Sequence, residues 1–493
     1  MVGRITSLSA RLRALMRGIY IVPAVAVTVT IVACGGGGTA STSAPLATSA
    51  TTRTSVGTIT GFGSVHLNGV KFETTGATIN VDGKAGVQSD LHAGEVIEVK
   101  GHHDAASGKD FADEIEFRGN IQGPVSTIDT VAQTLLVLGQ TVSVSADTSF
   151  DDSITPGSLA GIKVGDNLEV SGMPAAGGTL HATRIERKAA GAGFQVIGSA
   201  ASTDTTAKTL KINSLVVNFS AATVVDFPSS GPKNGDLVEA FGTALDSTGA
   251  LQATRLELRT GKELEADMNG QMELEGLVTR FASATDFDVA GRPVTTSSST
   301  TFEGGAASDL ALNVRVEAEG SMNASGILSA TKVQVGHPAE DRIAGQVDSV
   351  DATAGTVVVL GIHISVDAMT RFEDHSSQKI ETFNFTNVHT GDWLEIRGTP
   401  SSGSGNSVTA MRVDRLQPQS EVRLTGAVAT IEQPNFTVLS TTVATTSATQ
   451  FSNGLNVTTF FASSTGTIAS VKGSWNGTIL TADQVQIGED EED

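Results

Sequence analysis

Short runs of alternating apolar and polar residues recur along the chain and predict β-strands. In GDNLEVSG, residues 165–172, Leu168 and Val170 would lie on one face of a strand and Glu169 on the other. Near-copies of this motif are GEVIEVKG from Gly94, GDLVEAFG from Gly235 and GDWLEIRG from Gly391. The pattern predicts one recurring strand with an apolar inner face and an acidic outer face.

A second strand follows each copy and contains an alanine. The segments are HATRIE, QATRLE, SATKVQ, TAMRVD and TADQVQ, and the first copy has EIEF after Ala112. Leu180 and Ala182 are two positions apart, but the next apolar residue, Ile185, is three further on. A β-bulge after the alanine would bring all three side chains to one face.

The residue pairs that open and close the motif define the repeat. They are Gly94 and Gly101, Gly165 and Gly172, Gly235 and Gly242, Asn313 and Gly320, Gly391 and Gly398, and Gly466 and Gly473. A period of about 70 to 80 residues predicts six modules. Their expected bounds are 56–118, 120–188, 193–260, 272–336, 342–417 and 421–487.

Strand order within a module predicts its fold. In the second copy, NIQGPVSTID and TLLVLGQTVSV give three strands, a short helical turn fits SLAGIKVGD, and two final strands follow. Asn68-Gly69 marks the corresponding hairpin in the first copy, since both residues tolerate positive φ. Three strands, a connection and two strands is the order of an oligonucleotide/oligosaccharide-binding (OB) barrel. We therefore expect an all-β protein, a tandem array of six small five-stranded OB-like β-barrel modules after a signal peptide and flexible linker.

The N-terminal segment has the layout of an export signal. Four arginines precede an apolar run over residues 19–33, which is too short for a membrane span. The run ends in IVAC, and its Cys34 is the only cysteine. IVAC resembles the lipobox of bacterial lipoproteins, although Val32 stands where small residues are usual. The resemblance implies cleavage after residue 33 and lipidation of Cys34, and Gly35 behind it implies the outer membrane. The alternative is a free cysteine behind an ordinary signal.

Charge and composition describe the flanking segments. Residues 34–55 are rich in Gly, Ser and Thr, which is typical of a flexible linker, and the acidic stretch 488–493 is expected to be a solvated tail. Removing residues 1–33 deletes four positive charges and no negative one, so the net charge falls from −21 to −25. An excess of acid this large argues against nucleic acid as a partner.

The repeated segments resemble a known bacterial family. A glycine near the first strand, the LGQTV-type hairpin, GDNLEVSG and the closing ATRIE are similar to the repeats called domain of unknown function 5666. The family is common in exported lipoproteins and has no established activity. The resemblance therefore implies a fold and an address, and no cofactor.

Candidate chemistry is sparse. His102, His103 and Asp104 stand together in GHHDAASGKD. Adjacent histidines can bind zinc or copper, but the two histidines have no further ligand at the spacing of a metal site. The alternative is that these side chains are simply solvated. Asp151 and the neighbouring Asp152 fit a calcium ligand pair or a simple turn. Trp475, in the loop GSWNGT, is a candidate contact for glycan rings or is packed in the fold.

The expected function follows from this sparseness. We expect a non-enzymatic, lipid-anchored envelope protein that presents its modules as a spacer or interaction scaffold. Its partners would be the membrane, through the anchor, and envelope proteins or glycans. The alternative is a lipoprotein that binds envelope glycans or divalent cations.

The charges of the two recurring strands suggest cross-strand ion pairs on the barrel exterior. Each pair would help to fix the register of a hairpin, and the alternative is an acidic stripe for a ligand. The expected pairs are Glu169 with Arg184, Glu239 with Arg255, Glu317 with Lys332, and Glu395 with Arg412.

Overall fold

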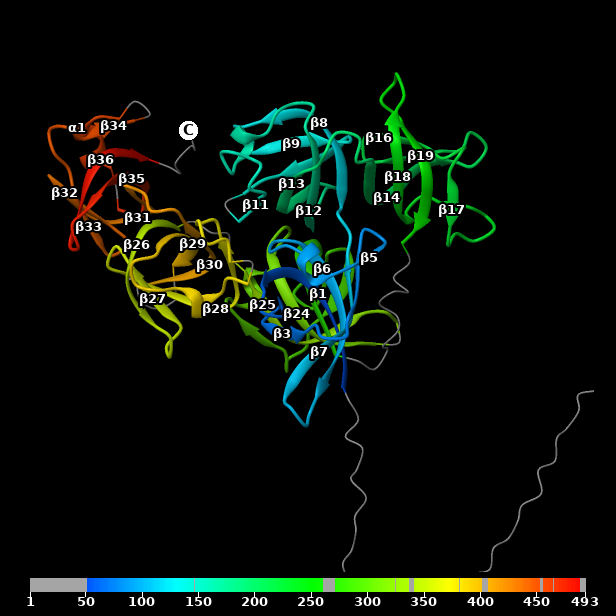
Figure 1. The fold of residues 1–493 in the computed structure, drawn as a ribbon, viewed down its shortest axis with the longest axis horizontal. Helices are drawn as coiled ribbons and strands as arrows, with labels where there is room; N and C mark the ends of the chain where they lie inside the picture. The colour runs from blue at the N-terminus through cyan, green and yellow to red at the C-terminus, as the bar shows by residue number, and fades with distance from the viewer. Residues whose placement is uncertain are drawn as a thin grey trace, which may run out of the picture. The chain divides into compact units, whose positions relative to one another are not determined.

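The computed structural model contains six β-modules in chain order (Figure 1). It describes residues 51–145, 147–259, 271–323, 325–336, 341–380, 382–400, 407–452, 455–463 and 465–487. Cys34, most of the linker and the acidic tail lie outside these residues, so the predictions made for them stay predictions. The linker was expected to reach residue 55, but the first strand already begins at Thr51. The run TTRTS is rich in β-branched residues and pairs with strand β6, which explains this difference.

The first three modules have the following elements. Module 1 contains β1 (Thr51–Gly61), β2 (Val65–Leu67), β3 (Val70–Glu73), β4 (Thr78–Val81), β5 (Lys84–Gly86), the 3₁₀ turn η1 (Gln88–Asp90), β6 (Val96–Asp104) and β7 (Lys109–Phe117). Module 2 contains β8 (Ile121–Asp129), β9 (Thr134–Val137), β10 (Gln140–Ser143), β11 (Ser149–Phe150), η2 (Leu159–Gly161), β12 (Asn167–Pro174) and β13 (Leu180–Arg187). Module 3 contains β14 (Phe194–Asp204), β15 (Thr209–Ile212), β16 (Leu215–Asn218), β17 (Thr223–Val225), β18 (Leu237–Leu245) and β19 (Leu251–Leu258).

The last three modules repeat this order. Module 4 contains β20 (Gln271–Ser283), β21 (Asp286–Val289), β22 (Arg292–Thr295), β23 (Thr301–Glu303), η5 (Ala307–Asp309), β24 (Arg315–Met322) and β25 (Leu328–Val335). Module 5 contains β26 (Asp341–Asp351), β27 (Thr356–Val359), β28 (Ile362–Asp374), η6 (Phe385–Asn387), β29 (Trp393–Pro400) and β30 (Ser407–Leu416). Module 6 contains β31 (Val422–Glu432), β32 (Asn435–Val438), β33 (Thr441–Ala444), β34 (Gln450–Phe451), the helix α1 (Val457–Phe461), β35 (Ile468–Trp475) and β36 (Ile479–Ile487).

The strands of a module pair in a closed circuit. In module 2, β8 pairs with β9, β9 with β10, β10 in parallel with β13, β13 with β12, and β12 with β8. The corresponding strands of the other modules pair in the same order. The expected architecture of tandem five-stranded OB-like barrels is confirmed.

The recurring glycines have two separate structural roles. The glycine that opens the motif has a positive φ, as at Gly165 (φ +93°), and Asn313 replaces it in module 4 with φ +66°. The glycine that closes the motif meets the next strand, because a Cβ on Gly172 would lie 2.3 Å from the carbonyl oxygen of His181. The strand therefore begins in a turn that favours glycine and ends where only hydrogen fits.

The predicted bulge after the alanine is confirmed. In module 2 the register shifts at Ala182, so that Gly172 lies opposite Ala182 and Ser171 lies opposite Arg184. The same shift occurs at the equivalent alanine in the other modules. Leu180, Ala182 and Ile185 are all buried as a result.

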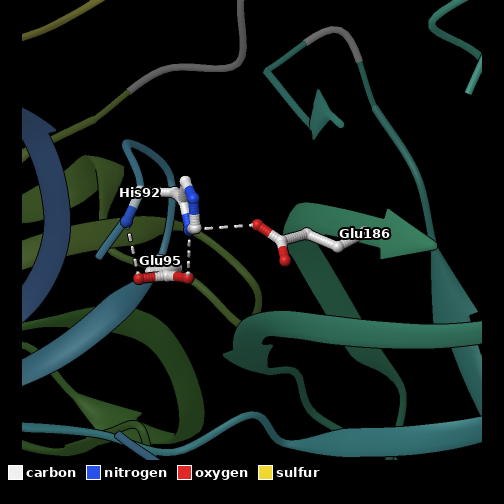
Figure 2. Close-up of side chains that lie close together, drawn as sticks. All are labelled: His92, Glu95 and Glu186. Atoms are coloured by element: carbon white, nitrogen blue, oxygen red, sulfur yellow. Dashed lines mark hydrogen bonds and ion pairs between the residues drawn. The ribbon is translucent and has the colours of Figure 1, made fainter. Parts of the chain in front are cut away.

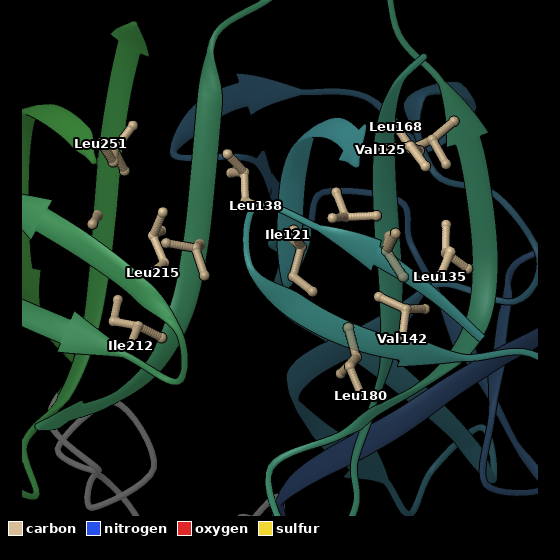
Figure 3. Packing of buried hydrophobic residues seen from close by; sticks show 14 of the residues in the cluster. Ile121, Val125, Leu135, Leu138, Val142, Leu168, Leu180, Ile212, Leu215 and Leu251 are labelled. Carbon is tan, nitrogen blue, oxygen red and sulfur yellow. The ribbon is translucent and has the colours of Figure 1, made fainter. Parts of the chain in front are cut away.

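The modules also associate through their first strands, in a way that the sequence did not indicate. β1 pairs in parallel with β20, β8 pairs with β14, and β26 pairs with β31. One hydrophobic core runs through modules 2 and 3, and another through modules 5 and 6. Figure 3 shows Leu138 of module 2 on the side that faces Leu215 and Ile212 of module 3. The modules are therefore joined by paired strands and shared cores as well as by the segments that link them in sequence.

Candidate functional site

Two groups of histidine and carboxylate side chains stand out among the described residues. One consists of His92, Glu95 and Glu186, and the other of Glu373, His375 and Asp414. Figure 2 shows the first group, in which Glu186 of strand β13 approaches a turn of module 1. The first group thus combines residues of modules 1 and 2, whereas the second lies within module 5.

The turn that precedes β6 positions His92 and Glu95. The backbone N–H of His92 donates to Oε2 of Glu95 (2.8 Å), and the N–H of Glu95 donates to the carbonyl of His92 (3.2 Å). Gly94 between them has φ +90°, and a Cβ there would lie 3.0 Å from the carbonyl oxygen of Thr183 in module 2. The positive φ of the turn favours glycine, and the close approach of the two modules leaves little room for a Cβ.

The three side chains of the first group converge on one nitrogen. Nδ1 of His92 lies 3.2 Å from Oε1 of Glu95 and 3.2 Å from Oε1 of Glu186. Glu95 is 2% exposed, and burial raises its pKa. The contact with Glu95 raises the pKa of His92. The pKa of Glu186 falls to about 2, because Arg184 and His92 outweigh the effect of burial.

Arg184 connects the first group to the second. Its Nε donates to Oε1 of Glu186 (2.6 Å), and its Nη1 donates to the carbonyl of Ala93 in module 1 (3.0 Å). The same Nη1 lies 3.8 Å from Oε2 of Glu373 in module 5. One buried guanidinium thus contacts three modules.

The second group is surrounded by cations. Arg371 lies 3.4 Å and Arg412 3.8 Å from Glu373, and Nε of Arg412 lies 2.7 Å from Asp414. Nδ1 of His375 lies 2.9 Å from Asp152 of module 2. Burial lowers the pKa of His375, but Glu373 and Asp414 outweigh it and raise the pKa to about 9.

Further hydrogen bonds join modules 2 and 5 at the same place. Nη1 of Arg412 donates to the carbonyl of Thr148 (2.7 Å), Arg371 donates to the carbonyl of Asp147, and Ser149 donates to Glu373. Charges of opposite sign therefore alternate across the junction of modules 1, 2 and 5. Their chemical effect is to fix the modules to one another, since each buried charge has a partner of opposite sign.

The metal ligands suggested by the sequence do not form a site. His102 lies 3.0 Å from Asp113, and His103 lies 3.2 Å from Asp110. Asp104 accepts N–H groups from its own turn. The two histidines are adjacent in β6, so their side chains point to opposite faces of the strand.

The four predicted cross-strand ion pairs are wrong. The bulge places Arg184 opposite Ser171, and Glu169 opposite Glu186. Arg255, Lys332 and Arg412 are displaced in the same way. The observed ion pairs are Glu169 with Lys188, Arg184 with Glu186, Glu239 with Arg118, Arg255 with Glu257, Lys332 with Glu319, Glu395 with Arg342, and Arg412 with Asp414.

The motif glutamates are also not on a solvated exterior. Glu169, Glu239 and Glu317 are 4%, 0% and 2% exposed. Glu239 accepts hydrogen bonds from Gln195 of its own module (2.9 Å) and from Arg118, which follows module 1 (3.0 Å). At Glu239 the outer face of the recurring strand is therefore a contact face between modules.

The structure also places Trp475, Asp151 and Asp152, which the sequence singled out. Trp475 is half-buried, packs against the core of modules 5 and 6, and lies near Gly361 of module 5. Asp152 pairs with His375 and Lys379 of module 5, and Asp151 accepts the N–H of Ser153 in a turn. Cys34 lies outside the described residues. Among the described residues, no helix is both long and apolar enough to cross a bilayer.

Sequence reasoning missed His92, Glu95 and Glu186, although one signal was present. The motif opens with Gly-Asp in copies 2, 3 and 5 but with Gly-Glu in copy 1. In module 5 the aspartate, Asp392, accepts the N–H of His389 (2.8 Å), as Glu95 does for His92. The longer side chain of Glu95 also brings its second oxygen to the imidazole.

Comparison with known proteins identifies the repeats. The family model for Domain of unknown function (DUF5666) matches residues 54–116, 122–186, 199–257, 275–334, 344–414 and 425–486. No curated protein matches the chain. The solved structure "drosophila Unr CSD456" is 10% identical over 46% of this chain and 98% of that chain, with a TM-score of 0.11, which supports no conclusion on arrangement or function. The six family matches span more than half of the sequence, and the chain therefore belongs to the family of repeats described as Domain of unknown function (DUF5666).

Proposed function

We propose that this protein is a non-enzymatic, lipid-anchored protein of the bacterial cell envelope whose modules dock into an interaction scaffold. The observation that carries the proposal is the buried charge network at the junction of modules 1, 2 and 5. Independent modules on a string would leave Arg184 and Glu373 in water, whereas both are 8% exposed. Burial of paired charges serves to fix one arrangement rather than to add stability.

The proposal that the protein is not an enzyme rests on the role of its buried charged groups, which form ion pairs with one another. The matched family carries no described activity, and the titratable groups of the network are held by ion pairs within and between modules. A catalytic acid or base must instead be free to exchange its proton with a substrate.

Docking can be tested with Arg184→Met, which keeps the length of the side chain but removes the guanidinium. The variant should unfold in separate calorimetric steps at lower temperature, because modules 1 and 5 lose a common contact. Lys211→Met, on an exposed position of module 3, is the matched control. An unchanged thermogram for Arg184→Met would contradict the scaffold.

The anchor is tested separately, through Cys34. The proposed lipidation predicts that Cys34→Ser remains unprocessed or leaves the membrane fraction on cell fractionation. If this variant matures and sorts like the wild type, the anchor proposal is wrong while the docking of the modules is unaffected.

The alternative proposal is a lipoprotein that binds envelope glycans or divalent cations. Trp475 gives the glycan version little support, because its half-buried side chain packs against the core of modules 5 and 6. The cation version has a specific candidate in the side chains around His92.

A further inference from the structure

We propose that His92, Glu95 and Glu186 bind one first-row transition metal ion, for which Zn²⁺ is the natural probe. The inference deepens the cation-binding alternative. It does not depend on lipidation, but it requires modules 1 and 2 to be docked, since His92 and Glu95 belong to module 1 and Glu186 belongs to module 2. One imidazole nitrogen with two carboxylate oxygens suits Zn²⁺ and its neighbours better than Ca²⁺ or Mg²⁺, which take oxygen ligands.

The distances between the donor atoms fit such an ion. Bonds of about 2.1 Å at tetrahedral angles place two ligand atoms about 3.4 Å apart. Nδ1 of His92 lies 3.2 Å from a carboxylate oxygen of Glu95 and 3.2 Å from one of Glu186, and the donor atoms all lie within 4.8 Å of one another. Small side-chain adjustments therefore suffice to enclose a metal ion.

The ligands are also held in place and reachable. The N–H of His92 fixes Oε2 of Glu95 at 2.8 Å, and Lys188 lies 2.9 Å from Oε2 of Glu186. In each carboxylate the other oxygen is the one that points to the imidazole. The side chain of His92 is 45% exposed, so an ion can enter from solvent.

Arg184 is the main competitor for a cation, because its Nε donates to Oε1 of Glu186 (2.6 Å). The guanidinium of Arg184 also lies 3.8 Å from the carboxylate of Glu373, which neutralises part of its positive charge. A metal-bound carboxylate commonly keeps such an outer hydrogen bond, which orients the ligand. Two carboxylates, a neutral imidazole and a dication sum to zero charge.

The second group of the charge network shows what excludes a metal. Glu373 faces three buried guanidiniums, those of Arg184, Arg371 and Arg412, within 3.8 Å. A dication there would meet three positive charges. The first group faces one guanidinium and the ammonium of Lys188, and its histidine is open to solvent. The two groups are therefore expected to differ in metal binding although their ligand types are alike.

The sharpest variant is Glu95→Asp, which restores the Gly-Asp turn that module 5 already uses. Asp392 in that turn accepts the N–H of His389 (2.8 Å), so the shorter acid supports the fold. It would not reach the imidazole of residue 92 or a shared ion. His389→Ala is the matched control, because that histidine is exposed and occupies the same position of the motif.

The experiment titrates the full mature chain carrying Cys34→Ser with Zn²⁺ by calorimetry, and with Co²⁺ by visible absorption. We expect one equivalent of Zn²⁺, and Co²⁺ bands of low coordination number. His92→Ala and Glu95→Asp should lower the affinity at least about 100-fold, with circular dichroism unchanged, whereas His389→Ala should not. No uptake by the parent chain, or equal uptake by Glu95→Asp, would overturn the site. Loss of binding only in His102→Ala with His103→Ala would place the metal elsewhere and also overturn it.

Discussion

The glutamate of the recurring motif should affect stability with opposite sign in different modules. Burial and the nearby Glu275 raise the pKa of Glu317 in module 4 to about 8. Burial also acts on Glu395 at the equivalent place in module 5, but Arg397 and Arg342 outweigh it and hold the pKa at about 2. One position of one motif is thus expected to be neutral in one copy and charged in another.

The magnitudes follow from linkage. For Glu317 the folded pKa lies above the unfolded value of 4.5, so stability falls as the pH rises from 4.5 to 8, by at most about 5 kcal/mol. For Glu395 the folded pKa lies below 4.5, so its contribution of at most about 3 kcal/mol is present above pH 4.5 and is lost as the pH falls through 2.

The test replaces each glutamate by glutamine. Glu317→Gln should stabilise module 4 by several kcal/mol at pH 8.5 and by less than about 1 kcal/mol at pH 5, because the charge it removes is costly only at high pH. Glu395→Gln should destabilise module 5 at both pH values. Hydrogen exchange of the peptides that contain β24 and β29, corrected for intrinsic rates, resolves the two modules. A Glu317→Gln variant that is destabilised equally at both pH values would refute the reasoning.

Three further predictions concern the junctions and the repeat. Gly172→Ala should destabilise module 2 by more than about 2 kcal/mol in urea unfolding, because its Cβ would lie 2.3 Å from a carbonyl oxygen. The raised pKa of His375, about 9 against 6.5, gives a contribution that is complete below pH 6.5 and lost as the pH rises through 9. Exchange protection of β11 should therefore fall above pH 9 in the parent and be insensitive to this step in His375→Gln. The fragment 120–259 should melt cooperatively and at a higher temperature than 120–188, since the two modules share one core; equal melting temperatures would show that the shared core adds nothing.

Local features of the fold could be predicted from the sequence because their causes are local. The spacing of Leu180, Ala182 and Ile185 indicates a bulge, and the bulge is present. Asn68-Gly69 indicates a tight hairpin, and both residues have positive φ (49° and 74°). Alternation, turn residues and spacing act over a few positions, so a single repeat contains all the information that they need.

The contacts between modules could not be predicted in this way. Arg184 and Glu373 meet across 189 positions of sequence, and no pattern within either repeat indicates the other. The predicted pairing of Glu169 with Arg184 failed for a local reason: Arg184 lies opposite Ser171 and Glu169 lies opposite Glu186, so the two residues are two positions out of register. Glu95 was detectable in principle, as a glutamate where copies 2, 3 and 5 have aspartate, but its partner Glu186 belongs to the next module.

Which modules contact one another also affects how stability should be distributed among the repeats. In a solenoid each repeat contacts its sequence neighbours, and stability is close to a sum of nearest-neighbour terms. Here β1 of module 1 pairs with β20 of module 4, and Asp147 of module 2 lies 3.3 Å from Arg315 of module 4. Modules that are distant in sequence thus pair their strands and form buried ion pairs with one another. The motif glutamates diverge in charge state through residues of their own modules, because Glu275 faces Glu317 whereas Arg397 and Arg342 face Glu395. Copies of one motif are therefore not interchangeable in the folded chain.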